Sequence, residues 1–469
     1  MCGIIGVVRR PATRAVPEPE EILDPLGVAA SALAELPADP PAVLDLLGRA
    51  ATGLEATDRL LRGTPGVSCL LRHPSVVAEA GALLDTVAAR LARLERHLDA
   101  GAAGLGPDHL EAVNAALIRV KDAAWAVQRD RLPTAEKVRA LVGHDAGIAA
   151  IEAFTSVQQA LSALDRLEVR GRDSAGLHLL VTGHRLDLTA PAIATLLGER
   201  EGDRLFESLA VRASGAAGAG EPVLSFVYKA AAEIGELGDN TAALRAAIEG
   251  DQLLHLALRA EGAQALVLGH TRWASVGIIS EANAHPLNSD EEAGATSGPY
   301  VTAALNGDVD NFADLKSAHA LVLAPEITTD AKVIPTLVSR RVAAGESLDS
   351  AFRAAVASME GSVAIGASAA IAPDHLHLAL RGSGQALYVG LAEDLYIVAS
   401  EPYGVVEETS TYLRMDGETP ANPENPTASR GQIVILDGSR AGTLEGIDRH
   451  AYDGTWLPVA EADLATAQI

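Results

Sequence analysis

Cys2 is the residue with the clearest capacity for chemistry, because it directly follows the initiator methionine. Cysteine is small enough for removal of that methionine to be expected, which would leave a thiol and a free α-amine on one residue. The thiol has a reference pKa near about 8.5 and the amine one of about 8, so both exchange protons around neutral pH. Cys2 would then supply a nucleophile together with its base. An ordinary buried strand that contains a cysteine is an equally good interpretation of residues 1–8 alone.

Three further stretches place polar side chains beside predicted strands, where a plain core would not need them. They are Arg170-Gly171-Arg172-Asp173-Ser174-Ala175-Gly176, Gly269-His270-Thr271-Arg272-Trp273-Ala274-Ser275-Val276-Gly277 and Leu305-Asn306-Gly307-Asp308. Each also has a structural interpretation. Asn306-Gly307 is a common hairpin turn, and Arg170 with Asp173 could form a capping ion pair. Arg272 could be a surface cation, and Trp273 is more often a core residue than a functional one.

The composition limits the class of protein. The 469 residues suffice for about two to four domains with a large core, and 48% of them are apolar but only 3% aromatic. The 37 Lys and Arg residues against 62 Asp and Glu residues give a net charge of −25, which disfavours nucleic acid and anionic membranes as partners. No apolar run reaches the roughly 20 residues of a membrane span, and no signal-peptide pattern is present.

Cysteine and histidine usage indicates a reduced, cytoplasmic protein without a metal site. The two cysteines are Cys2 and Cys69, and reduced thiols are the better interpretation than a single disulfide bridge. Cys69 is predicted to be a small core residue. His270 and His285 lack a third ligand at metal-binding spacing, so neither is expected to bind a metal ion.

A helical insertion is predicted near the start of the chain. Residues 9–40 are rich in Pro and Glu and are expected to be loop with short helical pieces, whereas 41–143 are rich in Ala, Leu and Arg. Apolar residues recur there at steps of three and four: Leu84, Val87, Leu91, Leu94 and Leu98, then Val113, Leu117, Val120, Ala124 and Val127. The two stripes predict an antiparallel helical hairpin with a structural role.

From residue 145 onward the pattern becomes one of strands with a few helices. Helices are predicted over 148–167, 228–260, 330–344 and 348–359, and a flexible loop over 214–220. Strands are predicted over 177–181, 265–269, 300–305, 362–368, 376–380, 386–389, 395–399 and 432–436. This order favours an α+β domain of stacked sheets over a doubly wound fold.

Together, these stretches resemble the class II glutamine amidotransferases, which have the Ntn-hydrolase fold, an αββα four-layer sandwich. Within that group the chain is most similar to the glutaminase half of glutamine–fructose-6-phosphate aminotransferase (glucosamine-6-phosphate synthase). The residues that carry the resemblance, in the family's order, are Cys2-Gly3-Ile4-Ile5-Gly6, the stretch 170–176, His270-Thr271-Arg272-Trp273-Ala274-Ser275, Ser280-Glu281-Ala282-Asn283-Ala284-His285-Pro286, Asn306-Gly307 and Thr329-Asp330.

The resemblance implies the catalytic roles. Cys2 would attack the side-chain amide of glutamine, forming a thioester and releasing ammonia, with its own α-amine relaying the proton. Asn306 and the N–H of Gly307 would form the oxyanion hole. Arg170 and Asp173 would support the N-terminal strand from behind the site.

The resemblance also implies how glutamine is bound. Arg272 would hold the α-carboxylate, a task suited to a planar cation with two parallel donors. Asp330 would pair with the α-ammonium. Trp273 and Ser275 would belong to a loop that closes over the substrate, and the family's tryptophan also gates the passage of ammonia.

The chain departs from the family pattern at several positions. The family has a tyrosine where Arg172 stands, histidines where Val276 and Leu305 stand, and an acid where Lys332 stands. These changes concern loop closure and fine specificity, and they leave the nucleophile and the pair of Arg272 and Asp330 in place.

The expected organisation is a discontinuous type-2 amidotransferase domain (1–9 and 145–440), a helical insertion (41–143) and a C-terminal segment (441–469) leading toward sugar isomerase domains, which this chain would lack. The expected activity is hydrolysis of L-glutamine, without a cofactor, supplying ammonia for glucosamine-6-phosphate synthesis. The partner would be the isomerase domains that bind fructose 6-phosphate, and a homodimer is compatible with this. The alternatives are a glutaminase of the amidophosphoribosyltransferase type, another Ntn amide hydrolase and an inactive regulatory module.

Overall fold

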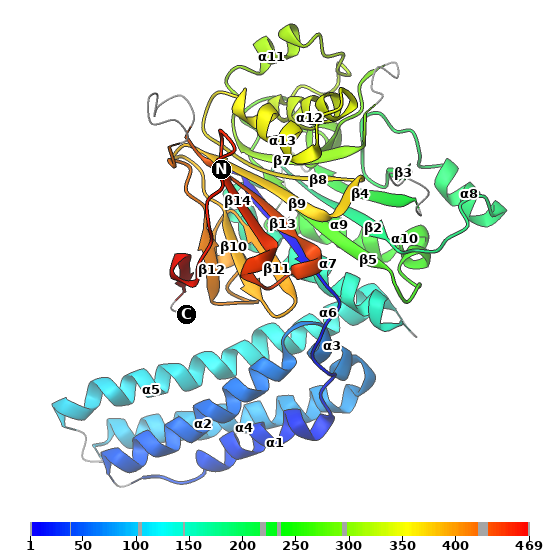
Figure 1. Ribbon diagram of the computed structural model, residues 1–469. Coiled ribbons are helices and arrows are strands. Elements are labelled where there is room, and N and C mark those ends of the chain that lie inside the picture. The colour runs from blue at the N-terminus through cyan, green and yellow to red at the C-terminus, as the bar shows by residue number, and fades with distance from the viewer. Residues whose placement is uncertain are drawn as a thin grey trace. The chain divides into compact units, whose positions relative to one another are not determined.

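The computed structural model describes residues 2–37, 39–101, 106–143, 146–215, 222–231, 236–292, 298–420 and 430–467. The chain divides into two compact units (Figure 1). One contains Met1–Pro11 with Asp145–Gln468, and the other is Ala12–His144.

The larger unit is built on two antiparallel sheets. Among the described residues the first sheet has nine strands, in the order β15 (Leu464–Thr466), β12 (Thr411–Arg414), β10 (Tyr388–Ala392), β11 (Leu395–Ala399), β1 (Gly3–Arg9), β5 (Gln264–Arg272), β2 (Ser174–Thr182), β4 (Val223–Ala231) and β3 (Val211–Ser214). The second has six, in the order β14 (Ile447–Ala451), β13 (Gln432–Asp437), β9 (Ala372–Arg381), β8 (Val363–Ala369), β7 (Val301–Gly307) and β6 (Leu287–Asn288). β1 therefore occupies the centre of the larger sheet.

Helices cover the outer faces of the two sheets (Figure 1). α7 (Ile148–Leu167) and α9 (Asp239–Glu249) pack on the first sheet, and α12 (Val333–Ala343) and α13 (Leu348–Ala357) pack on the second. The inner faces meet in an apolar core that includes Ile4, Leu268 and Leu378. The unit is thus the four-layer α+β sandwich that the sequence predicted, which confirms the fold class. The shorter helices are α8 (Pro191–Gly198), α10 (Gln252–Ala257) and α11 (Phe312–Ala318), with 3-10 turns at Glu168–Arg170, Glu281–Asn283, Asp330–Lys332, Pro402–Gly404, Gly438–Arg440, Leu444–Gly446 and Glu461–Asp463.

Small residues let the first strand lie tightly between its neighbours. A Cβ atom on Gly3 would approach within 2.7 Å of the Leu167 Cβ, and one on Gly6 would approach within 2.6 Å of the Leu376 Cδ2. Both separations are shorter than any ordinary carbon contact. The glycines of the N-terminal stretch therefore fix β1, and with it the position of Cys2, between α7 and the second sheet.

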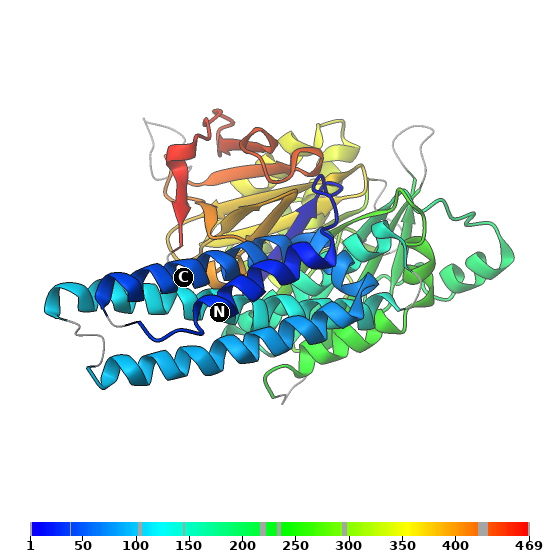
Figure 2. The ribbon, with the colours of Figure 1, turned by 90° about the horizontal axis from the view of Figure 1, so that it is seen from below.

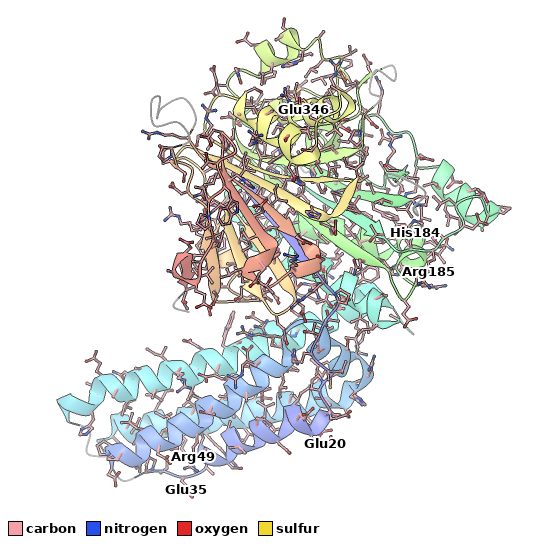
Figure 3. All side chains as sticks on the ribbon, in the orientation of Figure 1. Glu20, Glu35, Arg49, His184, Arg185 and Glu346 are labelled. Carbon is pink, nitrogen blue, oxygen red and sulfur yellow. The ribbon has the colours of Figure 1, made fainter. Side chains whose placement is uncertain are left out.

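The smaller unit is helical, and its helices α1 (Pro19–Ala32), α2 (Pro40–Leu61), α4 (Pro74–Asp99) and α5 (Pro107–Trp125) run alongside one another (Figures 1 and 2). α3 (Gly63–Arg72), a π-helical turn (Ala126–Arg131) and α6 (Leu132–Val142) complete it. Exposed charged side chains, Glu20, Glu35 and Arg49 among them, lie outside the apolar core (Figure 3). No helix of the described residues has both the length and the apolarity that crossing a membrane requires.

The two predicted helical stripes are present in α4 and α5, but their main packing partners differ from the prediction. α4 packs chiefly against α1, and α5 packs chiefly against α2, so the two do not form a simple hairpin. Leu84, Val87 and Val113 all contribute to one shared core. The predicted hairpin was incomplete because α1 and α2 also contribute to this core, and the sequence pattern did not predict both of them as helices.

Two other predicted elements differ from the structure. α1 is a helix of 14 residues within a stretch predicted to be mainly loop. Tyr228 lies in β4 rather than at the start of a helix, because β4 is buried on both faces and so lacks the alternation that marks a strand. Residues 441–467 contribute β14 and β15 to the sheets. Of the loop predicted over 214–220, residues 216–220 lie outside the described part of the chain.

Candidate active site

Cys2 lies at the end of β1, where that strand pairs with β5. Gly3 is opposite Thr271, which brings Cys2 beside the last residues of β5 and the loop that follows. The backbone N–H of Trp273 donates to the Cys2 Sγ at 3.3 Å, and the Sγ also lies 3.5 Å from the Trp273 carbonyl oxygen. Burial raises the pKa of the Cys2 thiol, and the hydrogen bond from Trp273 opposes that rise.

Asn306 and Gly307 reach Cys2 from the other sheet. They end β7, which pairs with β8 over its whole length, so this Asn-Gly pair does not form a hairpin turn. The Asn306 Nδ2 donates to the Cys2 carbonyl oxygen at 3.1 Å. Gly307 has a φ of +89°, and a Cβ there would lie 2.0 Å from the Ser362 carbonyl oxygen, so only glycine fits.

Arg272 and Asp330 are both buried, and Arg272 lies close enough to Cys2 and to Asp330 to feel the charge of each. The Arg272 guanidinium donates to the carbonyl oxygen of Ile278 at 3.0 Å and to that of Val276, so its donors face the loop that follows β5. Burial lowers the pKa of Arg272, while the charges of Cys2 and Asp330 oppose that change.

The Asp330 carboxylate accepts hydrogen bonds from two neighbouring groups. Its Oδ2 accepts from the Val309 N–H at 2.6 Å, and its Oδ1 accepts from the Thr329 hydroxyl at 3.3 Å. Burial raises the pKa of Asp330, and the Val309 N–H opposes the rise. No ion pair within 4 Å joins Asp330 to Arg272 in the described part of the chain, although the charge of Asp330 acts on the guanidinium.

The loop after β5 is anchored by two acids. The Ser275 hydroxyl donates to the Asp308 carboxylate at 2.6 Å, and the Ala274 N–H donates to the Asp173 carboxylate at 2.8 Å. Asp173 also donates its own N–H to the Arg272 carbonyl oxygen at 3.1 Å. The Trp273 side chain remains 58% exposed. Ser275 and Asp173 therefore hold the loop, while Trp273 stands at its surface.

Arg170 contacts a different part of the fold from Asp173. It forms an ion pair with Glu401 on the loop after β11, whereas Asp173 bonds to β5 and its following loop. Lys332, which stands where an acid was expected, donates to the Asn288 carbonyl oxygen and to the Asn288 Oδ1, each at 2.7 Å. Its ammonium group is therefore engaged with β6 rather than with Asp330.

Asp308, His270 and His285 belong to stretches singled out in the sequence, but no role was predicted for them beyond excluding the two histidines as metal ligands. Asp308 accepts a hydrogen bond from Ser275, and both histidines form hydrogen bonds with Leu305. Among the described residues, no group of three or more His, Cys, Asp or Glu side chains could hold a metal ion.

Sequence comparison finds similarity to named enzymes over part of the chain. No family model matches the chain. It is 30% identical over 148 residues to the glutamine--fructose-6-phosphate aminotransferase [isomerizing] of Bacillus anthracis, a match covering 32% of this chain and 23% of that enzyme. The enzyme of the same name from Staphylococcus aureus is 29% identical over 201 residues, covering 43% and 30%. The match thus spans between about a quarter and a third of the relatives' length, and these relatives are enzymes of the glutamine amidotransferase kind.

Two solved structures show a distant structural similarity to the chain. The glutamine phosphoribosylpyrophosphate amidotransferase of B. subtilis, complexed with ADP and GMP, is 18% identical, covers 63% of this chain and 47% of its own, and has a TM-score of 0.38. A structure described as the allosteric regulatory enzyme of purine biosynthesis is 16% identical, with coverage of 63% and 46% and a TM-score of 0.37.

Proposed function

We propose that the chain hydrolyses L-glutamine to glutamate and ammonia through a thioester on Cys2. The observation that carries the proposal is the meeting of Cys2 with Asn306, whose side-chain nitrogen lies 3.1 Å from the Cys2 carbonyl oxygen. A nucleophile and a preorganised donor from two different sheets are thereby brought to one point. The similarity to glutamine--fructose-6-phosphate aminotransferases supports the choice of glutamine.

The reaction needs one nucleophile, one proton carrier and donors for the oxyanion. Once Met1 is removed, the Cys2 amine takes the thiol proton and the sulfur attacks the side-chain amide carbon. The negative oxygen that forms is bound by the Asn306 amide and the Gly307 N–H. The amine then gives the proton to the leaving nitrogen, and ammonia departs as the thioester forms. Water cleaves the thioester and releases glutamate.

Binding of the amino-acid part of glutamine falls to Arg272 and Asp330. The α-carboxylate pairs with the guanidinium, whose donors at present bond to the carbonyl oxygens of Val276 and Ile278. Carboxylate is a stronger acceptor than a peptide carbonyl, so the substrate replaces these bonds. The α-ammonium pairs with Asp330. The loop that carries Trp273 and Ser275 closes over the bound amino acid.

The ammonia is proposed to serve glucosamine-6-phosphate synthesis from fructose 6-phosphate, with isomerase domains as the partner. Names of the relatives support this wider role. The glutaminase domain would comprise 1–9 and 145–440, with 41–143 as a helical insertion and 441–469 as the C-terminal segment. Arg170 and Asp173 are proposed to support the site.

The test is release of glutamate and ammonia from glutamine by the purified chain. Cys2→Ala should abolish release while the fold is retained. Cys69→Ala is the matched control, because Cys69 is a buried free cysteine in the helical unit, and it should leave the rate unchanged. Hydrolysis of amides that lack an α-amino acid group, with glutamine untouched, would favour another Ntn amide hydrolase. No turnover of any amide would favour a regulatory module.

A further inference from the structure

Two buried histidines lie stacked beside the end of β7. The rings of His270, on β5, and His285 have centroids 4.4 Å apart and an interplanar angle of 30°. Their side chains are 0% and 3% exposed. Both rings bond to Leu305, the residue that precedes Asn306. The pair is therefore packed directly against the residue proposed to bind the oxyanion.

The contacts of His270 determine where its proton lies. Its Nε2 is 2.8 Å from the Leu305 carbonyl oxygen and 3.1 Å from the Asn306 Oδ1. A carbonyl oxygen can only accept, so the Nε2 must carry the hydrogen and donate it. The Leu305 carbonyl thus selects the Nε2–H form of His270, whichever way the Asn306 amide is turned.

That form in turn determines the orientation of the Asn306 amide. With Nε2–H as a donor, the Asn306 oxygen must face the ring, and its nitrogen then faces Cys2. The reversed amide would set two donors against each other at His270. It would also set two oxygens against each other at the Cys2 carbonyl, and each mismatch leaves a buried polar group unsatisfied.

His285 supports the same arrangement from the other side. Its Nδ1 accepts from the Leu305 N–H at 3.3 Å, so its Nε2 carries the hydrogen and points to the Thr329 hydroxyl, also at 3.3 Å. That hydroxyl donates to Asp330. The stacked pair therefore connects the residues proposed to bind the oxyanion and the substrate ammonium.

We propose that His270 is a positioning residue that sets the orientation of the Asn306 side-chain amide, so that its nitrogen faces the reacting carbonyl group. The proposal rests on the proposed glutamine hydrolysis for its kinetic consequences. His270 does not touch the substrate and takes no proton from Cys2. Consistent with this, burial lowers the pKa of His270 to about 3 and that of His285 well below its usual value, so both rings are neutral at working pH.

The kinetic test compares two substitutions of His270. His270→Leu removes the donor, whereas His270→Gln offers a side-chain nitrogen at a similar distance from the backbone. Loss of one oxyanion donor costs roughly 100- to 1,000-fold in kcat. We expect His270→Leu to lower kcat by about 10- to 100-fold, since the amide still samples the correct orientation. KM for glutamine should change little, and His270→Gln should recover most of kcat.

His178→Leu is the matched control. His178 is also a buried histidine of the sandwich, 1% exposed, and it bonds to the Thr302 hydroxyl at 3.0 Å. The His178→Leu variant should have an unchanged kcat per folded molecule. Thermal unfolding measures the fraction of each variant that is folded. Two results would overturn the proposal: full kcat in folded His270→Leu, or a loss that His270→Gln fails to recover and His178→Leu reproduces.

A second measurement does not depend on activity. In a chain labelled with ¹⁵N-histidine, the ring signals that disappear in His270→Gln should be those of a neutral Nε2–H imidazole at pH 7. A charged ring or an Nδ1–H form would contradict the proposal. If the wild-type chain released no glutamate while these signals were as expected, the proposed function would be wrong but the arrangement of His270 and Asn306 would stand.

Discussion

The backbone N–H of Trp273 lies 3.3 Å from the Cys2 sulfur and donates a hydrogen bond to it. This contact follows from the pairing of β1 with β5, which sets Gly3 opposite Thr271. An N–H donor stabilises a thiolate relative to a thiol. The register of two central strands therefore does more than build the sheet, since it places a donor where the proposed nucleophile develops charge.

Removing the charge of Asp308 should make Cys2 more reactive at lower pH. Burial is the main cause of the raised pKa of the Cys2 thiol, and the Asp308 carboxylate adds to it, because a nearby negative charge disfavours the thiolate. Asp308→Asn should shift the pH profile of Cys2 alkylation by iodoacetamide to lower pH. Asp314→Asn, an exposed acid on α11, is the control and should not shift it. An unmoved profile in Asp308→Asn would show that this carboxylate does not act on the thiol.

Arg272→Lys should chiefly weaken glutamine binding. Lysine keeps the charge but loses the two parallel donors of the guanidinium. Because a hydrogen bond to a charged group is worth roughly 1.5–3 kcal/mol, we expect KM for glutamine to rise about 10- to 100-fold with a smaller change in kcat. Steady-state glutamate release measures both. Glutamine dependence identical to that of the wild-type chain would refute the role of Arg272 in carboxylate binding.

Lys229→Met should stabilise the chain at neutral pH. The Lys229 Nζ is buried without a hydrogen-bond partner in the described part of the chain, and burial lowers its pKa to about 7. In the unfolded chain the pKa of a lysine is about 10.4. Between pH 7 and this value the unfolded state therefore binds one proton more than the folded state. The free energy of unfolding of the wild-type chain should thus rise with pH across that range. Burying an ionised amine without a hydrogen-bond partner costs free energy, so an apolar side chain of similar length should raise the free energy of unfolding at pH 7.

Urea unfolding at pH 7 and pH 9 checks this expectation. The gain from Lys229→Met should be smaller at pH 9, where the buried amine is already neutral in the folded state. Lys316→Met, on the surface of α11, should show no such pH dependence. A destabilised Lys229→Met chain at pH 7 would mean that the contact of the ammonium with the Phe206 ring, 5.4 Å from the Nζ to the ring centroid, outweighs the cost of burying the charge.

The sequence predicted local elements well where one pattern decided the outcome. α7 occupies the predicted 148–167, because a long run without Gly or Pro and with helical periodicity has few alternatives. β4 was missed because burial on both faces removes the alternation that distinguishes a strand from a buried helix. α1 was missed because Pro25 lies within it, although a neighbouring helix supplies the packing that holds it.

The site could be predicted only in part. The resemblance to known amidotransferases named Cys2, Arg272, Asn306 and Asp330. In the structure Asn306 donates to Cys2, and the charges of Cys2 and Asp330 both act on Arg272, while the roles of these residues stay predictions. The hydrogen bond between His270 and Asn306 could not be predicted, because β5 and β7 lie in different sheets and the contact depends on how the two sheets stack on each other. Nor could the sequence show that the Arg272 donors bond to the loop that follows them.

The most direct test of the central claim is mass spectrometry of the N-terminal peptide after rapid acid quenching with glutamine. We predict a peptide that begins at Cys2 and carries a glutamyl group on that residue, and the unmodified peptide when glutamine is omitted. A peptide that still begins with Met1, or turnover of glutamine with the glutamyl group on any other residue, would contradict the account.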